Sequence, residues 1–278
     1  MRYITNQDID AFETMLRLDE KAEATIRKYV KAAAGLWEFL AGKPVTKENI
    51  INYRQYLQER QKAQTVNGNL TAVNTFLDFL NMGDCKVKLL KVQRRAFLDE
   101  TKELTEAEYR RLLAAAEKKG NRRLQLLMMT LCSTGIRISE LSYITVETAK
   151  RGRADISLKG KYRTIILPKG LCRKLLRYAA EQGIGTGCVF RTRTGRPVDR
   201  SNVCHDMKKL CRLAKVDPRK VFPHNLRHLF ARCFYAVEKN LVYLADILGH
   251  SRLETTKIYI AASASAHEKI LQKMNLLL

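Results

Sequence analysis

The first 85 residues repeat apolar positions with the period of an α-helix. Ile26, Val30 and Trp37, for example, fall on one face of a helix over about residues 20–40. Polar residues, glycine and proline separate this helix from three others with the same pattern, and Asn6, Gln7 and Asp8 are candidates to cap the first. The four predicted helices span about residues 6–18, 20–40, 46–61 and 65–80. Short turns between amphipathic helices predict a small bundle whose core includes Trp37.

The helical period is lost over residues 86–103, which are rich in Lys and Arg. This segment is predicted to be a basic linker between an N-terminal domain, 1–85, and a C-terminal domain, 104–278. The second domain opens on Thr105 and Glu108, whose spacing predicts a capping box at the start of a helix over about 105–118. Another helix is expected over about 121–133.

One segment has the pattern of a β-hairpin. Residues 155–158 and 164–167 predict two short strands, and residues 159–163 between them predict a turn with a strongly basic tip. The chain from about residue 171 onward reads as mostly helical. The expected fold class is therefore mainly α with one small β-hairpin.

The net charge of the chain indicates which class of partner it binds. The 278 residues include 51 Lys and Arg but 28 Asp and Glu, a net charge of +23, and residues 150–227 alone carry 21 basic and 5 acidic side chains. Such an excess favours a polyanion, either nucleic acid or an anionic membrane. No apolar run approaches the length of a membrane span and no signal peptide is visible, which favours nucleic acid and a cytoplasmic protein. Seven cysteines without a C-x-x-C motif predict free thiols.

Two motifs in the second domain carry candidate chemistry. In TGIRISEL, Arg137 follows a glycine and starts a helix, where it could bind a phosphate or only pair with Glu140. In PHNLRH, His224 and Arg227 share a helix face. His224 and His228 have a spacing compatible with a metal, but the carboxylate of a zinc-protease motif is missing.

Three other signals are weak when taken singly. Lys159, Lys161 and Arg163 at the hairpin tip could enter a DNA groove or be a solvated turn. His250 follows Gly249 at a helix end, and Tyr259, a tyrosine near the C-terminus, is ordinarily a packing or surface residue.

Taken in order, these signals resemble the tyrosine recombinase (phage integrase) family and are similar to core-type integrases and Xer-like recombinases. The match includes Arg137, a basic hairpin, HNLRH, and the segment LGHSRLETTKIY that contains His250 and Tyr259. The N-terminal bundle resembles that family's core-binding domain, and residues 104–278 resemble its catalytic domain. Leu229 departs from the family, since many members have Thr there.

The resemblance implies a site-specific DNA recombinase that forms a covalent 3′-phosphotyrosyl intermediate and needs neither a cofactor nor a metal. The implied catalytic residues are Tyr259 as nucleophile, Arg137, Lys159, His224, Arg227 and His250, with Glu140 and His228 in support and Lys161 and Arg163 contacting DNA. Lys161 is the alternative to Lys159 as general acid.

The implied partners are double-stranded DNA with core sites and three further copies of the chain in a tetramer, with an excisionase or other accessory protein as a further candidate and no membrane. Residues 267–278 form an apolar stripe that predicts an exchange helix, docked on a neighbouring protomer or on its own domain. A nucleoid-associated protein in the cytoplasm is expected. A catalytically silent DNA-binding protein and a type IB topoisomerase remain as alternatives.

Overall fold

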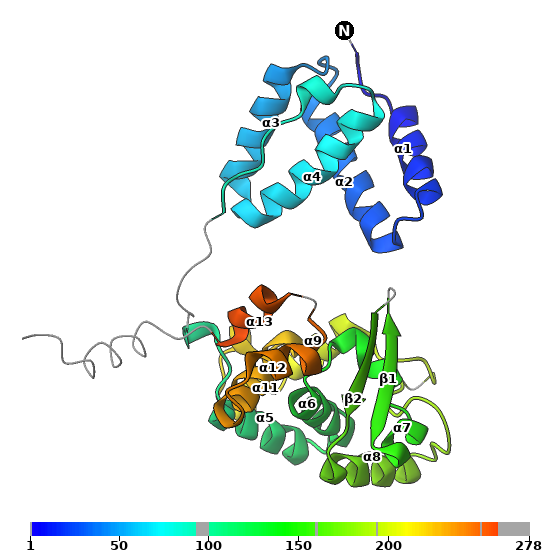
Figure 1. Ribbon diagram of the computed structural model, residues 1–278, viewed down its shortest axis with the longest axis vertical. Coiled ribbons are helices and arrows are strands. Elements are labelled where there is room, and N and C mark those ends of the chain that lie inside the picture. Colours follow the sequence, from blue (N-terminus) through cyan, green and yellow to red (C-terminus); the bar gives the residue numbers. More distant parts are fainter. Residues whose placement is uncertain (1, 93–99, 159–160, 193, 251, 261–278) are drawn as a thin grey trace, which may run out of the picture. The chain divides into compact units, whose positions relative to one another are not determined.

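The computed structural model describes residues 2–92, 100–158, 161–192, 194–250 and 252–260. The chain divides into two units, Met1–Arg94 and Arg95–Leu278 (Figure 1). Each unit encloses its own cluster of buried apolar side chains. Within the described residues the elements are mostly helices with one two-stranded antiparallel sheet, which confirms the predicted fold class.

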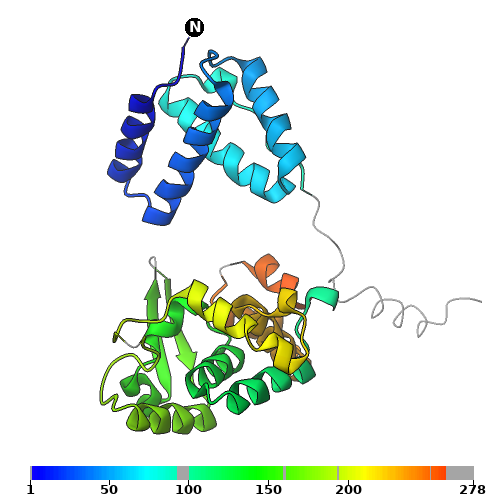
Figure 2. The ribbon, with the colours of Figure 1, turned by 180° about the vertical axis from the view of Figure 1, so that it is seen from behind.

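The first unit is a bundle of four helices followed by a short 3₁₀ turn. These elements are α1 (Asn6–Leu18), α2 (Glu23–Leu40), α3 (Lys47–Arg60), α4 (Ala63–Phe79) and η1 (Gly83–Cys85). Helix α2 contacts each of the other three helices, and Figure 2 shows the same bundle from behind. The prediction of four helices in this region is confirmed.

Two details of the bundle differ from the prediction. Helix α1 is capped by Thr5, whose hydroxyl accepts from the amide of Asp8 at 3.3 Å while the Asp8 carboxylate accepts from the Thr5 amide at 2.8 Å. Trp37 does not lie in the core, because it is 39% exposed, whereas its neighbour Leu36 is fully buried. Since 100° separates successive residues on a helix, an apolar pair leaves open which member faces inward.

Part of the predicted linker packs on the first unit. Asn74 exchanges two hydrogen bonds with the backbone of Val87 (2.9 and 3.1 Å), and Asn67 does the same with Leu90 (2.9 and 2.7 Å). The side chain of Val87 is buried in the core of the bundle. The side chains of Asn67 and Asn74 thus hold residues 87–90 against α4 by pairing with their backbone, as a neighbouring β-strand would.

The second unit contains the remaining elements. They are η2 (Glu100–Lys102), α5 (Glu106–Lys118), α6 (Arg122–Thr134), η3 (Ile138–Tyr143), α7 (Val146–Arg151), β1 (Arg153–Leu158), β2 (Lys161–Ile166), α8 (Lys169–Glu181), α9 (Arg200–Lys208), α10 (Cys211–Ala214), η4 (Pro218–Lys220), α11 (Pro223–Val237), α12 (Leu241–Leu248) and α13 (Leu253–Ile260). The predicted capping box is confirmed, with Thr105 N donating to Glu108 at 2.8 Å and Glu108 N to Thr105 at 3.2 Å.

The hairpin is present, but its strands are longer than the pattern indicated. Strand β1 pairs with β2 in antiparallel register, with Arg153 opposite Ile166 and Leu158 opposite Lys161. Lys161 and Arg163, expected in the turn, therefore belong to β2. Lys159, the predicted general acid, lies outside the described residues, as does the predicted exchange helix at 267–278.

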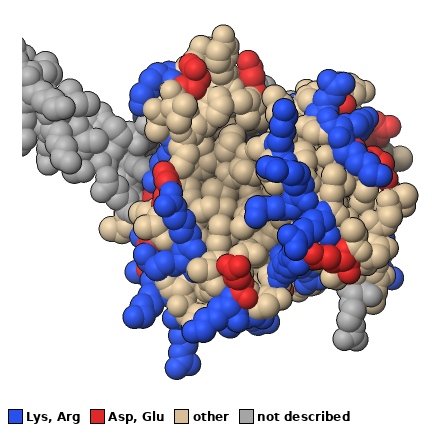
Figure 3. Space-filling view, turned by 90° about the horizontal axis from the view of Figure 1, so that it is seen from below, with Lys and Arg blue, Asp and Glu red and all other residues tan. Residues whose placement is uncertain are grey.

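The surface of the second unit is rich in basic side chains. On the face seen in Figure 3, Lys and Arg side chains predominate over Asp and Glu. In α8, for example, Lys169 and Arg173 are exposed. Among the residues described, no helix is both long and apolar enough to span a membrane.

Candidate active site

A glycine turn places Arg137. Helix α6 ends at Thr134, and its C-cap residue, Gly135, has a φ of +63°, the left-handed conformation that favours glycine. A β-carbon at this position would lie 2.3 Å from the ring of Phe230. Beyond the turn, the backbone amide of Arg137 donates to Glu140 at 2.7 Å, and its guanidinium donates to the same carboxylate at 3.1 Å. Both contacts orient a side chain that stays 43% exposed.

Arg163 pairs with the same Glu140 carboxylate as Arg137. The prediction placed Arg163 at the tip of the hairpin, whereas the structure places it within β2. Its guanidinium pairs with Glu140 and also donates to the carbonyl of Ile247 at 2.8 Å. The Arg163 side chain is 11% exposed and the Glu140 side chain 3%. It also lies beneath Gly249, where a β-carbon would come within 2.5 Å of it. Arg163 therefore ties β2 both to the segment of Arg137 and to the end of α12.

Helix α11 carries Arg227 into the interior. This side chain is 1% exposed and donates to the carbonyls of Gly135 and Leu248 and to Nε2 of His250. Burial, followed by the nearby charge of Arg137, lowers the pKa of Arg227 to about 10, so it remains charged at neutral pH. None of the ion pairs found among the described residues involves Arg227. A buried guanidinium surrounded by neutral acceptors is suited to bind an anion.

His250 is held by two contacts that fix its neutral tautomer. An arginine can only donate, so Nε2 of His250 accepts from Arg227 at 2.9 Å. The ring proton then lies on Nδ1, which is 2.8 Å from the hydroxyl of Thr256. Thr256, fully buried in α13, belongs to the segment LGHSRLETTKIY, but no role was predicted for it. Its contact holds α13 against His250 and therefore next to Arg227.

Tyr259 lies among three imidazole rings. It is 5% exposed on α13, a helix that contacts both α11 and α12. Its ring stacks on His250 at 5.4 Å between centroids, meets His228 edge-on at 4.5 Å and lies 5.9 Å from His224. Its hydroxyl also interacts with the guanidinium of Arg227. Tyr259 therefore packs into the cluster formed by the histidines and Arg227 of its own chain.

The pKa values of His224 and His250 are both lowered to about 4. Burial contributes most to the lowered pKa in each case. The electrostatic effect of His228 and then that of Arg227 follow for His224, and that of Arg227 follows for His250. Although part of His224 remains exposed, both imidazoles are neutral at pH 7 and able to accept a proton.

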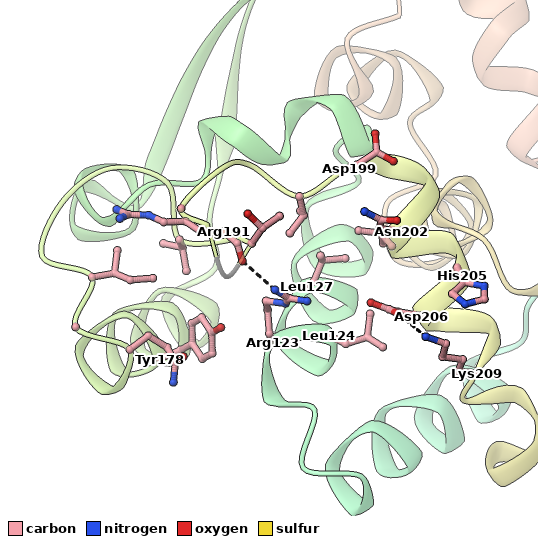
Figure 4. Close-up of a pocket in the computed structure, with 18 residues that line it drawn as sticks. Arg123, Leu124, Leu127, Tyr178, Arg191, Asp199, Asn202, His205, Asp206 and Lys209 are labelled. Atoms are coloured by element: carbon pink, nitrogen blue, oxygen red, sulfur yellow. Dashed lines mark hydrogen bonds and ion pairs between the residues drawn. The ribbon is translucent and has the colours of Figure 1, made fainter.

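The site opens into a cleft of about 820 Å³. Its lining includes Arg137, His224 and Arg227, so a group in the cleft reaches both arginines. A second cleft of similar size, between α6, α8 and α9, borders the first at Val198 and Asp199 but is lined by none of these three residues (Figure 4). There Arg123 donates to the Arg191 carbonyl at 2.9 Å and Lys209 pairs with Asp206 at 3.2 Å, so these charged groups already have partners.

The structure brings together most of the predicted site residues from distant parts of the chain. Arg137, Glu140, His224, Arg227, His228, His250 and Tyr259 belong to one cluster. His224 and His228 have a spacing compatible with a metal, but no group of three His, Cys, Asp or Glu side chains suited to a metal occurs among the described residues. No local pattern in the sequence indicated Glu103, whose carboxylate is hydrogen-bonded to His228.

Residues 102–266, more than half of the chain, match the phage integrase family. The chain belongs to this family of tyrosine recombinases. It is thus an enzyme that cuts and rejoins DNA in site-specific recombination.

A relative and two solved structures extend the likeness to both units. The tyrosine recombinase XerA of Pyrococcus furiosus is 25% identical over 284 residues, covering 99% of this chain and 96% of XerA. A lambda integrase dimer bound to a core site is 16% identical with a TM-score of 0.74, covering 92% of this chain and 94% of that one. XerH bound to its difH substrate is 17% identical with a TM-score of 0.72, covering 98% and 84%. At these identities the two structures support the fold.

Proposed function

We propose that this recombinase uses Tyr259 to cut double-stranded DNA at specific core sites. One observation carries the assignment: the phenol lies against three imidazoles and the buried guanidinium of Arg227. A phenol becomes a nucleophile when a neighbouring base takes its proton. A phosphodiester becomes an electrophile when positive donors hold its non-bridging oxygens. The surroundings of Tyr259 supply both a neighbouring base and a positive donor.

Arg137 and Arg227 are the proposed donors to the two non-bridging oxygens. Arg227 is pre-oriented by two backbone carbonyls, and Arg137 by Glu140. His250, which accepts from Arg227 in the DNA-free protein, is positioned to bond the same phosphate. Donors fixed before the reaction need no reorganisation, and losing one typically costs ~10²–10³-fold in rate.

The cleavage step moves one proton onto a base and one onto the leaving group. The oxygen of Tyr259 bonds to phosphorus while His224 takes its proton, with His228 as the adjacent imidazole. The bond to the 5′-oxygen breaks, and Lys159 protonates that oxygen by the role that the family resemblance gives it. The products are a 3′-phosphotyrosyl link and a free 5′-hydroxyl. Attack by the 5′-hydroxyl of another strand reverses the step, so bond energy is conserved without a nucleotide cofactor.

The proposed assembly is a tetramer on two DNA sites. One solved relative is a lambda integrase tetramer bound to a Holliday junction. We propose that residues 267–278 dock on a neighbouring protomer there, that residues 1–85 bind the core site, and that an excisionase or other accessory protein sets direction. With DNA as its substrate, the protein is expected to act in the cytoplasm at the nucleoid. Arg163 is not proposed as a DNA contact, because its guanidinium is engaged by Glu140 and Ile247.

A suicide DNA substrate tests the role of Tyr259. Wild-type protein should form a covalent adduct that survives SDS, whereas Tyr259→Phe should bind the same DNA and form none. The matched control is Tyr243→Phe, because Tyr243 is 58% exposed on α12. An adduct with Tyr259→Phe would refute the assignment. No adduct with the wild type would favour a catalytically silent DNA-binding protein, and relaxation of supercoils without strand exchange would favour a topoisomerase.

A further inference from the structure

Helix α11 has a second polar face that holds the start of the catalytic unit. Asn225, His228 and Arg232 follow one another at spacings of three and four, so they lie along one face. Their partners are three consecutive residues, 102–104. The contacts are Asn225 Nδ2 to the Lys102 carbonyl (2.8 Å), His228 Nδ1 to Glu103 Oε1 (3.2 Å) and Arg232 Nη2 to the Leu104 carbonyl. Backbone bonds on either side therefore anchor Glu103.

Glu103 is a buried carboxylate paired with His228. The residue is 7% exposed, and its second oxygen lies 3.8 Å from Arg232. Burial opposes its charge, but the hydrogen bond with His228 and the charge of Arg232 outweigh this and hold the pKa of Glu103 below its ordinary value. A charged carboxylate only accepts hydrogen bonds, so Nδ1 of His228 carries a proton. In the neutral imidazole, Nε2 is then the free acceptor.

The ring of His228, held in this orientation, also packs directly against the ring of Tyr259. It meets Tyr259 edge-on, with 4.5 Å between centroids and 82° between planes. It also contacts His224 at 4.8 Å in an edge arrangement. Any rotation of His228 would therefore change the surroundings of both the phenol and the proposed base.

We propose that Glu103 is a positioning residue for the nucleophile. It holds His228 in one orientation and one tautomer against Tyr259, and the anchored segment 102–104 holds Glu103 in place. A carboxylate that orients an imidazole is a recurrent way to fix the ring's free nitrogen. This inference rests on the proposed function of Tyr259 and adds the residue that aligns it.

The test compares two acidic residues of the same unit in the full-length protein. Glu108 is the control, because it too forms a shielded ion pair, 3.0 Å from Lys220, and it does not touch His228. The measurements are DNA affinity by gel shift, covalent adduct formation in a single turnover at saturating DNA, and thermal unfolding. The variants are Glu103→Ala, Glu103→Gln and Glu108→Gln.

We expect Glu103→Ala to slow adduct formation by ~10²-fold at saturating DNA, since small misplacements of a reacting group cost about that much. DNA affinity should stay at the wild-type value, because phosphate contacts elsewhere provide it. Glu103→Gln keeps an acceptor but loses the charge, so a smaller loss of about tenfold is expected. Glu108→Gln should cleave at the wild-type rate.

A substrate with a 5′-bridging sulfur separates nucleophile alignment from leaving-group chemistry. Sulfur leaves without a general acid, so this substrate should restore Lys159→Ala and should not restore Glu103→Ala. Restoration of Glu103→Ala, wild-type cleavage by Glu103→Gln, or an equal loss in Glu108→Gln would each overturn the inference. If Glu103→Ala does not fold, Glu103→Gln decides. Failure of the wild type to form any adduct would instead refute the proposed function.

Discussion

Replacing Arg163 by Met should destabilise the second unit by breaking a buried ion pair. The side chains of Arg163 and Glu140 are 11% and 3% exposed, and removing one partner of such a pair costs ~3–5 kcal/mol. Glu140 keeps Arg137 as a partner at 3.1 Å, so we expect the lower end, about 3 kcal/mol. For a unit of this size, that loss corresponds to a fall in Tm of roughly 6–12 °C.

The same substitution should slow DNA cleavage without weakening DNA binding. Arg163 bonds the Ile247 carbonyl at 2.8 Å and packs under Gly249, the residue before His250. Its loss frees both the carboxylate that orients Arg137 and the turn that holds His250. An arginine that contacted DNA from a hairpin tip would show the opposite pattern, with lower affinity and unchanged stability.

The assays are thermal unfolding of the DNA-free protein and gel shift with single-turnover cleavage. The control is Arg177→Met, because Arg177 is 76% exposed and pairs with Glu181 at 3.2 Å on the surface. Exposed pairs contribute ~0–1 kcal/mol, so its Tm should barely change. Equal Tm shifts for the two variants, or a loss of affinity alone for Arg163→Met, would refute the argument.

The remaining predictions concern Gly135 and pH. Gly135→Ala should lower both the stability and the cleavage rate, because the new β-carbon would lie 2.3 Å from Phe230. The control is Gly152→Ala, which has a similar φ of +73° but nothing within 4 Å, so it measures the backbone cost alone. Equal effects of the two variants in unfolding and cleavage assays would contradict this prediction. As the pH falls below about 6.5, the DNA-free protein should lose stability while its DNA affinity rises, measured by thermal unfolding and gel shift across pH.

The sequence was informative wherever a pattern is local. Helical periodicity and the Thr105–Glu108 spacing predicted elements that the structure confirms. The register of the hairpin was not predictable, because basic residues suit a strand end as well as a turn, and this misplaced Arg163. Trp37 was misplaced for a similar reason, since neighbouring apolar positions compete for one helix face.

Contacts between distant residues gave no local signal. The bond from His228 to Glu103 joins residues 125 apart, and Arg163 reaches Ile247 across 84. Glu108 was marked by its capping-box spacing from Thr105, but no such pattern marks Glu103. The resemblance to a family named the groups proposed to carry the chemistry and two groups in support, Glu140 and His228. The contacts of Glu103 and Thr256 appeared only in the folded chain.

The opposite pH trends follow from one property of His224 and His250. Both have pKa values lowered from 6.5 to about 4 in the folded, DNA-free protein. Folding therefore favours their neutral forms, and this contribution to stability is complete above about pH 6.5 and is lost as the pH falls toward 4. A bound phosphate places a negative charge beside the same imidazoles and raises their pKa values, so the DNA complex takes up protons. Affinity must then increase as the pH falls through this range.

His250→Gln and His224→Gln should flatten both trends, while His205→Gln, an exposed position on α9, should leave them unchanged. If stability and affinity fell together in the wild type, the phosphate would not lie beside these two rings.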